Sequence, residues 1–148
     1  MSLRAVVENV TSELRAQDAY SREKAASELA DWAESDSLSD EELRLVFSEL
    51  STVVAKEENS RVTESVWHAL SQIAMSNRGQ NFNWDFVSQS ICSLQRDCLE
   101  FALVCLGFSG EARFLPVISA QFANADPEIQ TAARTAYEEC IFRSEARA

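Results

Sequence analysis

Apolar and small residues recur with one spacing in four segments of the chain, and this recurrence constrains the fold more than any other feature. The spacing is i, i+4, i+7, i+8, which places four residues on one face of a helix. The first members of the four sets lie 37, 36 and 31 residues apart, a period that predicts stacked helix pairs. The sets are Ala25, Leu29, Trp32 and Ala33; Val62, Val66, Ala69 and Leu70; Cys98, Ala102, Cys105 and Leu106; and Ile129, Ala133, Ala136 and Tyr137.

A second ladder of apolar residues occupies the intervening segments, with first members 40, 37 and 31 residues apart. With only 3 glycines and 2 prolines, the chain has few residues for tight turns. The sequence therefore predicts an all-α fold: one domain over residues 1–148 with four stacked antiparallel helix pairs, at about 1–35, 39–76, 83–107 and 110–143. An irregular helical bundle is the alternative, because any amphipathic helix shows similar spacings. The sets are Val7, Val10 and Leu14; Phe47, Leu50 and Val54; Trp84, Val87 and Ile91; and Leu115, Ile118 and Phe122.

Capping residues mark several of the expected helix ends. Ser39 and Glu42 have the spacing of a capping box, and Asp126 precedes a proline that suits a first helical position. Ser60 is the expected cap of the fourth helix, and Gly107 or Gly110 is expected to end the sixth. The breaks between the eight expected helices fall near 17–21, 35–39, 57–60, 76–83, 94–96, 107–111 and 123–127.

The last helix pair resembles a HEAT repeat. Residues Phe114-Leu115-Pro116-Val117-Ile118 resemble the Leu-Pro step of a HEAT first helix, and Asp126-Pro127-Glu128-Ile129-Gln130 with Ala132-Ala133 resembles the start of its second helix. Gln130 stands where that family usually has arginine, and the match covers about a quarter of the chain. The resemblance implies a short HEAT-like α-solenoid of four pairs that binds a partner without catalysing a reaction.

The chain is strongly acidic, with 24 acidic against 13 basic residues and a net charge of −11. Residues 28–58 hold ten acids against Arg44 and Lys56, a net of −8. Such a surface repels duplex nucleic acid and anionic membrane, so neither is an expected partner. It favours association with a basic protein. Alternatively, the acidic segment only keeps the protein soluble.

The partner-binding residues follow from projecting the second helix of each pair at 100° per residue, on the assumption that these helices line a concave side. The positions equivalent to His68 are Asp31, Val104 and Thr135. Trp67 is either an aromatic anchor for the partner or a filler between repeats, and His68 has the alternative of being an ordinary surface residue. The predicted partner-binding residues are Asp31, Glu34, Asp36, Glu64, Trp67, His68, Glu100 and Glu138.

No catalytic, cofactor or metal motif is found, and we expect none of these activities. The single histidine lies far along the chain from the four cysteines, which form no Cys-x-x-Cys pair, and the glycines stand alone. Residues 1–17 lack a signal-peptide core, and the apolar run 101–108 is too short to span a bilayer. These features favour a cytoplasmic protein with reduced thiols.

Size and charge suggest a specific function, an immunity or inhibitor protein that neutralises a basic toxin, with a nuclease as the candidate toxin. Small acidic bacterial immunity proteins present carboxylates where phosphates would bind, and the similarity here is one of charge and size. A general HEAT-like adaptor or regulatory scaffold is the alternative. HEAT-like DNA glycosylases are a minor alternative, because the basic groove that they use is missing from this sequence.

Overall fold

The computed structural model describes residues 3–147, and these residues form eight α-helices and no strand. The prediction of an all-α fold is confirmed. The contacts divide the chain into two compact units, residues 1–76 and 77–148, each holding two helix pairs. The single domain expected over 1–148 stays a prediction. The helices are α1 (Leu3–Glu13), α2 (Ala19–Glu34), α3 (Asp40–Val54), α4 (Ser60–Met75), α5 (Asp85–Ser90), α6 (Arg96–Ser109), α7 (Leu115–Ala120) and α8 (Pro127–Arg147).

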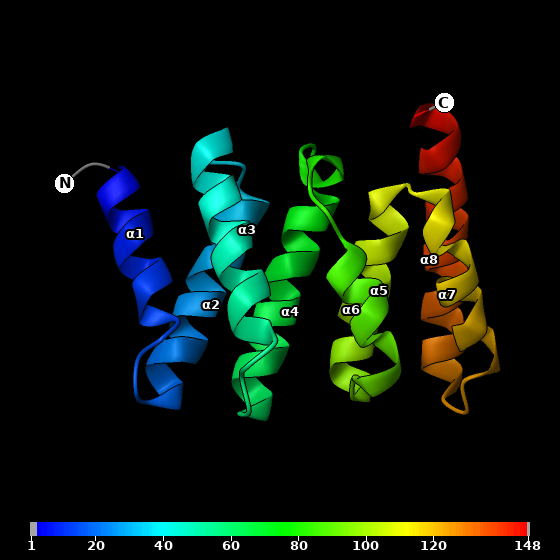
Figure 1. Cartoon of the computed structure of the whole chain (residues 1–148), viewed down its shortest axis with the longest axis horizontal. Helices are drawn as coiled ribbons and strands as arrows, with labels where there is room; N and C mark the ends of the chain where they lie inside the picture. Colours follow the sequence, from blue (N-terminus) through cyan, green and yellow to red (C-terminus); the bar gives the residue numbers. More distant parts are fainter. Residues whose placement is uncertain (1–2, 148) are drawn as a thin grey trace. The chain divides into compact units, whose positions relative to one another are not determined.

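The first unit is built from the hairpins α1–α2 and α3–α4. The second helices α2 and α4 pack along each other in the same direction, and α1 and α3 cover them (Figure 1). Of the predicted positions on or directly after α1 and on α3, Val7, Leu14 and Leu50 are buried, whereas Val10, Phe47 and Val54 are half-buried. The predicted positions on α2 and α4, apart from Trp32, lie in the core, because these helices turn them toward their neighbours. Its buried members include Val7, Leu14, Leu29, Val46, Leu50, Val62, Val66, Leu70 and Ile73.

The second unit repeats this plan with shorter first helices. Helices α6 and α8 pack along each other, α5 packs on α6, and α7 packs on α8 (Figure 1). Both α5 and α7 have only six residues and continue into 3-10 turns, at Ile91–Ser93 and Gln121–Ala123. The buried core includes Val87, Ile91, Cys98, Ala102, Leu103, Cys105, Leu106, Ile118, Ile129, Ala133 and Cys140.

Two ladder aromatics lie at the edge of the core. Trp32 and Tyr137 are half-buried, whereas the other members of the second-helix sets are buried. Tyr137 packs edge-on against Phe122, with 5.4 Å between ring centroids. Tyr137 therefore packs on a neighbouring aromatic ring while remaining partly exposed.

Most of the predicted caps are confirmed. The Ser39 hydroxyl accepts from the amide of Glu42 at 3.1 Å, and the Glu42 carboxylate accepts from the amide of Ser39 at 2.8 Å. Asp126 accepts from the amide of Glu128 at 2.9 Å. The Ser60 prediction is wrong, because Asn59 caps α4 by accepting from two backbone amides and Ser60 is already helical. Gly110 ends α6 with a left-handed backbone (φ 66°).

The backbones of α6 and α8 approach closely at Gly107. A Cβ added there would lie 2.9 Å from the carbonyl oxygen of Ala136 and 3.0 Å from its Cα. We expect Gly107→Ala to lower the free energy of unfolding by about 1–3 kcal/mol, because backbone atoms cannot move aside without separating the helices. Chemical denaturation would measure the loss.

The exposed substitution Thr135→Ala on α8 is the control, and its effect should stay within about 0.5 kcal/mol. Inside a helix, alanine is favoured over glycine by about 1 kcal/mol. If Gly107→Ala stabilises the protein, this helix preference outweighs the clash, and the close approach of α6 and α8 is not needed for stability.

Candidate protein-binding surfaces

The structure distributes the eight predicted partner-binding residues over both units, six in the first and two in the second. Asp31 and Glu34 are exposed on α2, and Glu64 is exposed on α4. His68 is half-buried on α4, with its Nε2 atom 3.2 Å from the Nε2 atom of Gln72. Glu100 lies on α6 and Glu138 on α8.

Asp31 and His68 occupy equivalent positions of two packed helices that run in the same direction. Equivalent positions on such helices point to the same side, so α2 and α4 present one common face. We call this face, made of Asp31, Glu34, Glu64 and His68, the α2–α4 acidic face. Asp31, Glu34 and Glu64 make no ion pair within residues 3–147. Their charges therefore remain available to a partner.

Trp67 does not belong to this face. Its side chain is 1% exposed, so it fills space between helices and cannot serve as an aromatic anchor for a partner. Of the two interpretations that the sequence left open, the structure supports packing. The reason is that Trp67 lies on the flank of the α4 apolar stripe, where neighbouring helices decide whether a side chain is covered.

Asp36 has a local structural role. It is exposed between α2 and α3 and is the one non-glycine residue with a left-handed backbone in the described chain (φ 57°). Aspartate tolerates this conformation better than most residues. Asp36 thus allows the reversal from α2 into α3, whatever its side chain contributes to binding.

Several acids of the net −8 segment are already paired with groups of the first unit. Glu41 pairs with Arg4 at 3.2 Å, Glu49 pairs with Arg15, and Glu42 is the buried half of the α3 capping box. Glu57 pairs with Arg22. The charge of residues 28–58 is therefore not one uniform surface, and Asp31 and Glu34 of the α2–α4 acidic face are among the acids that no internal cation pairs with.

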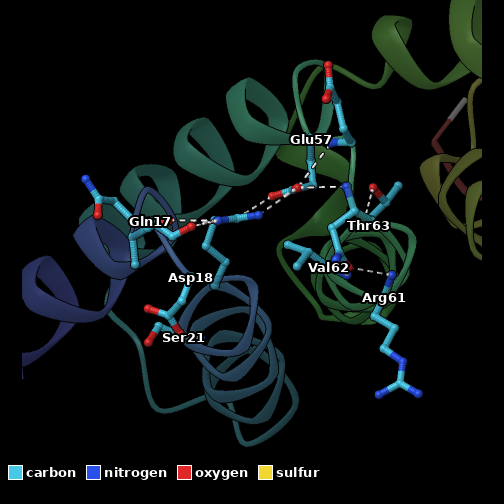
Figure 2. Close-up of polar contacts among 11 residues, drawn as sticks. Gln17, Asp18, Ser21, Glu57, Arg61, Val62 and Thr63 are labelled. Carbon is cyan, nitrogen blue, oxygen red and sulfur yellow. Dashed lines mark hydrogen bonds and ion pairs between the residues drawn. The ribbon is translucent and has the colours of Figure 1, made fainter.

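The Arg22–Glu57 pair is the most enclosed of these contacts, with side chains that are 19% and 8% exposed. Figure 2 shows the polar contacts around Glu57 as dashed lines. Arg22 Nε donates to Glu57 Oε1 at 2.9 Å and Arg22 Nη2 donates to Oε2 at 3.3 Å. Arg22 Nη1 also donates to the carbonyls of Ala16 and Gln17. The amide of Asn59 donates to Glu57 at 3.0 Å. This cluster ties the α1–α2 connection to the α3–α4 connection.

Burial by itself would raise the pKa of Glu57, but the hydrogen bond from Arg22 and the amide of Asn59 outweigh it, so the pKa is lowered. The carboxylate therefore stays ionised in the folded protein at neutral pH. Because the hydrogen-bond partners of both side chains belong to the first unit, we interpret the Arg22–Glu57 pair as a structural feature.

The second unit carries a groove between α6 and α8 with a volume of about 590 Å³. We call it the α6–α8 groove. Its α6 wall is a single stripe at i, i+4 and i+8, and its α8 wall is rich in small residues. It includes Val104 and Thr135, the positions equivalent to His68, which sequence reasoning aligned without marking them as a site. The lining residues are Glu100, Val104, Phe108, Pro127, Glu128, Thr131, Ala132, Thr135, Ala136 and Glu139.

The two predicted site residues of the second unit differ in their relation to this groove. Glu100 lines it, as the projection predicts for the second-helix face. Glu138 is exposed on α8 but does not line it, and the neighbouring Glu139 does. Glu139 follows Thr135 by four residues and stays on the stripe of α8 that lines the groove, whereas Glu138 lies one residue off that stripe.

The buried cysteines have no reactive environment. Burial raises the pKa of the Cys105 thiol, and burial raises that of Cys140, whose Sγ donates to the carbonyl of Glu111 at 3.3 Å. Within residues 3–147, no group of three or more potential metal ligands comes together. Nor does any helix in this range combine the length and apolar character needed to cross a membrane.

The fold defines an all-α chain made of helix hairpins, and the comparisons with known proteins agree at that level. Neither protein-family models nor curated proteins give a match. A crystal structure of an engineered protein from the Northeast Structural Genomics Consortium is similar, with a TM-score of 0.72 at 18% sequence identity. The match covers 94% of this chain and 64% of the engineered one, so the chain spans less than two thirds of that protein. At this identity the likeness concerns the fold alone.

Proposed function

We propose that this chain is a non-catalytic protein-binding module of HEAT-like helix pairs whose partner is a basic protein. The observation that carries the proposal is the α2–α4 acidic face. Asp31, Glu34 and Glu64 stay exposed and unpaired there, while other acids of residues 28–58 are used internally. Unpaired surface carboxylates attract a basic partner and raise its association rate.

An immunity or inhibitor protein against a basic toxin is the most economical form of this proposal. Carboxylates spaced along a rigid helical face can occupy the sites where a nuclease toxin binds phosphates, and no chemistry by the inhibitor is needed. The protein would then work in the cytoplasm, which agrees with free thiols at Cys98, Cys105 and Cys140 in the core.

A general adaptor or regulatory scaffold is the second candidate. The α6–α8 groove favours it, because an apolar groove is not needed to block a phosphate-binding surface. Affinity capture from the native host at low salt, followed by identification of the retained protein, separates the two. A toxin domain supports the inhibitor, and a basic protein without toxic activity supports the adaptor. Capture of acidic proteins only would contradict both.

We expect the double substitution Asp31→Lys with Glu34→Lys to slow association with the captured partner by about tenfold at low salt. It should also flatten the salt dependence of the association rate, because the unpaired carboxylates supply the attraction that salt screens. Stopped-flow or surface-based kinetics at several salt concentrations would measure both effects.

The matched control is Glu13→Lys with Glu145→Lys. These two acids are exposed on α1 and α8, and the double substitution changes the net charge by the same amount. If the control slows association as much as the Asp31 and Glu34 reversals do, the total charge matters and the α2–α4 acidic face is not the docking site.

A further inference from the structure

The α6–α8 groove has an apolar floor that the fold does not fill. Glu100, Val104 and Phe108 stand one turn apart along α6, and Ala132, Thr135 and Ala136 face them from α8. Beneath them the two helices touch at Gly107 and Ala136. Large side chains on one wall and small ones on the other leave an open volume of about 590 Å³, within the usual range for binding pockets.

One end of the groove is held by a stacked arginine. The Arg143 guanidinium lies 4.3 Å from the centroid of the Phe108 ring, and its Nε donates to Glu139 at 3.0 Å. These contacts fix the Phe108 ring against the groove. Phe142, the residue directly before Arg143 on α8, is an apolar side chain that is 69% exposed.

The other end is rich in carboxylates. A single cation, Arg96, pairs with Asp97 at 3.3 Å, Glu100 at 3.9 Å, Asp126 at 2.5 Å and also with Glu128. Four carboxylates around one guanidinium leave an excess of three negative charges. No basic side chain lines the groove itself. A cation arriving from a partner would therefore meet this excess negative charge beside the apolar side chains of the groove.

We propose that the α6–α8 groove binds an amphipathic segment of a partner protein, with apolar side chains in the groove and lysine or arginine at the Glu100–Glu128 end. The inference rests on the proposed function for the basic character of the partner, and it places a second contact in the other unit. A second copy of this chain is a poor occupant, because each copy carries a net charge of −11. Apolar burial supplies the affinity, and the carboxylates select the basic flank.

The test uses two synthetic helical peptides with the same Leu and Phe residues on one face. One carries lysines beside them and the other carries glutamates, and both bear a fluorescent label for anisotropy titration. We expect the lysine peptide to bind the wild-type chain and to shift the amide NMR signals of α6 and α8. The variant Thr135→Trp should weaken binding by about tenfold or more, because the new side chain occupies the groove.

The matched control for Thr135→Trp is Ala120→Trp, at an exposed position that does not line the groove, and it should leave binding unchanged. The double variant Glu100→Gln with Glu128→Gln should weaken binding of the lysine peptide by about three- to tenfold. It should not weaken binding of the glutamate peptide. Helical circular dichroism of each variant verifies folding.

The outcomes separate this inference from the proposed function. Three results would overturn the groove as the site of a basic segment. They are equal binding of both peptides, no binding of the lysine peptide, and lysine-peptide binding that is the same for Thr135→Trp as for the wild type. Loss of peptide binding on reversing Asp31 and Glu34 alone would also overturn it, although the α2–α4 acidic face would keep its support. Self-association blocked by Thr135→Trp would show that a second copy occupies the groove.

Discussion

Replacing Trp84 by alanine is expected to remove about 3–5 kcal/mol from the free energy of unfolding, the largest effect of any substitution considered for this chain. The indole is fully buried, and its Nε1 donates to the carbonyl of Gly79 at 2.9 Å. Phe86 stacks on it with ring centroids 6.2 Å apart. Removal therefore leaves a large cavity and takes the shorter of two hydrogen bonds from the Gly79 carbonyl, which keeps only the amide of Phe82 at 3.3 Å. Denaturation followed by circular dichroism would measure the loss.

The variant Trp84→Phe divides this effect into its parts. It keeps an aromatic ring beside Phe86 but removes the donor to Gly79, so we expect a smaller loss of about 1–3 kcal/mol. A loss below 1 kcal/mol for Trp84→Ala would mean that the site collapses around the cavity, contrary to the close packing that surrounds it.

The Trp84→Ala experiment also tests the domain prediction. If residues 1–148 form one cooperative domain, the variant should unfold in one transition that shifts as a whole. If the two compact units unfold independently, only the transition of residues 77–148 should move, and that of residues 1–76 should stay where it is.

Glu57→Gln is expected to lower the free energy of unfolding by about 1–2 kcal/mol at neutral pH, because Arg22 loses its enclosed ionic partner. The substitution should also change the pH dependence. The pKa of Glu57 is lowered from its ordinary 4.5, so the folded chain binds this proton less readily than the unfolded chain does. The stabilisation is therefore complete above about pH 5 and is lost as the pH falls through the lowered pKa.

The measurement compares unfolding of the wild type and Glu57→Gln between neutral pH and pH 3. The difference between them should shrink as the pH falls below 4.5, because protonation removes the same interaction from the wild type. The control is Glu8→Gln, which breaks an exposed pair with Arg4 one turn away, and its effect should stay within about 0.5 kcal/mol. A difference that stays constant down to pH 3 would contradict the assignment to Glu57.

The local features of this fold are those that the sequence predicts well. The capping box at Ser39 and the helix end at Gly110 involve residues only a few positions apart. All the groups that form them can therefore be identified from the local sequence. The ladder positions Val66 and Leu70 are buried as expected, because helical periodicity alone assigns them to the inner face. The one-residue error between Asn59 and Ser60 reflects two adjacent residues that cap almost equally well.

Pairings between distant residues are not predictable in the same way. Arg15 meets Glu49 and Arg22 meets Glu57 across 34 and 35 residues, so the acids left unpaired at Asp31 and Glu34 become known only when the helices are packed. The burial of Trp67 could not be predicted either, because it lies on the flank of the α4 apolar stripe. At such a position the packing of neighbouring helices decides whether the side chain is buried. For this reason Trp67 leaves the predicted partner-binding surface, and the binding role of the remaining residues stays a prediction.

The sequence by itself determined that this chain is helical, that its helices alternate between two apolar ladders, and that it carries a net charge of −11. These properties depend on periodicity and composition, which are present in the unfolded chain. Only the tertiary structure decided which carboxylates remain unpaired and where an open groove forms. The groove exists because Val104 and Phe108 face Ala132 and Thr135 above the Gly107–Ala136 contact. That arrangement requires two helices about 30 residues apart in sequence to pack, and no local pattern encodes it.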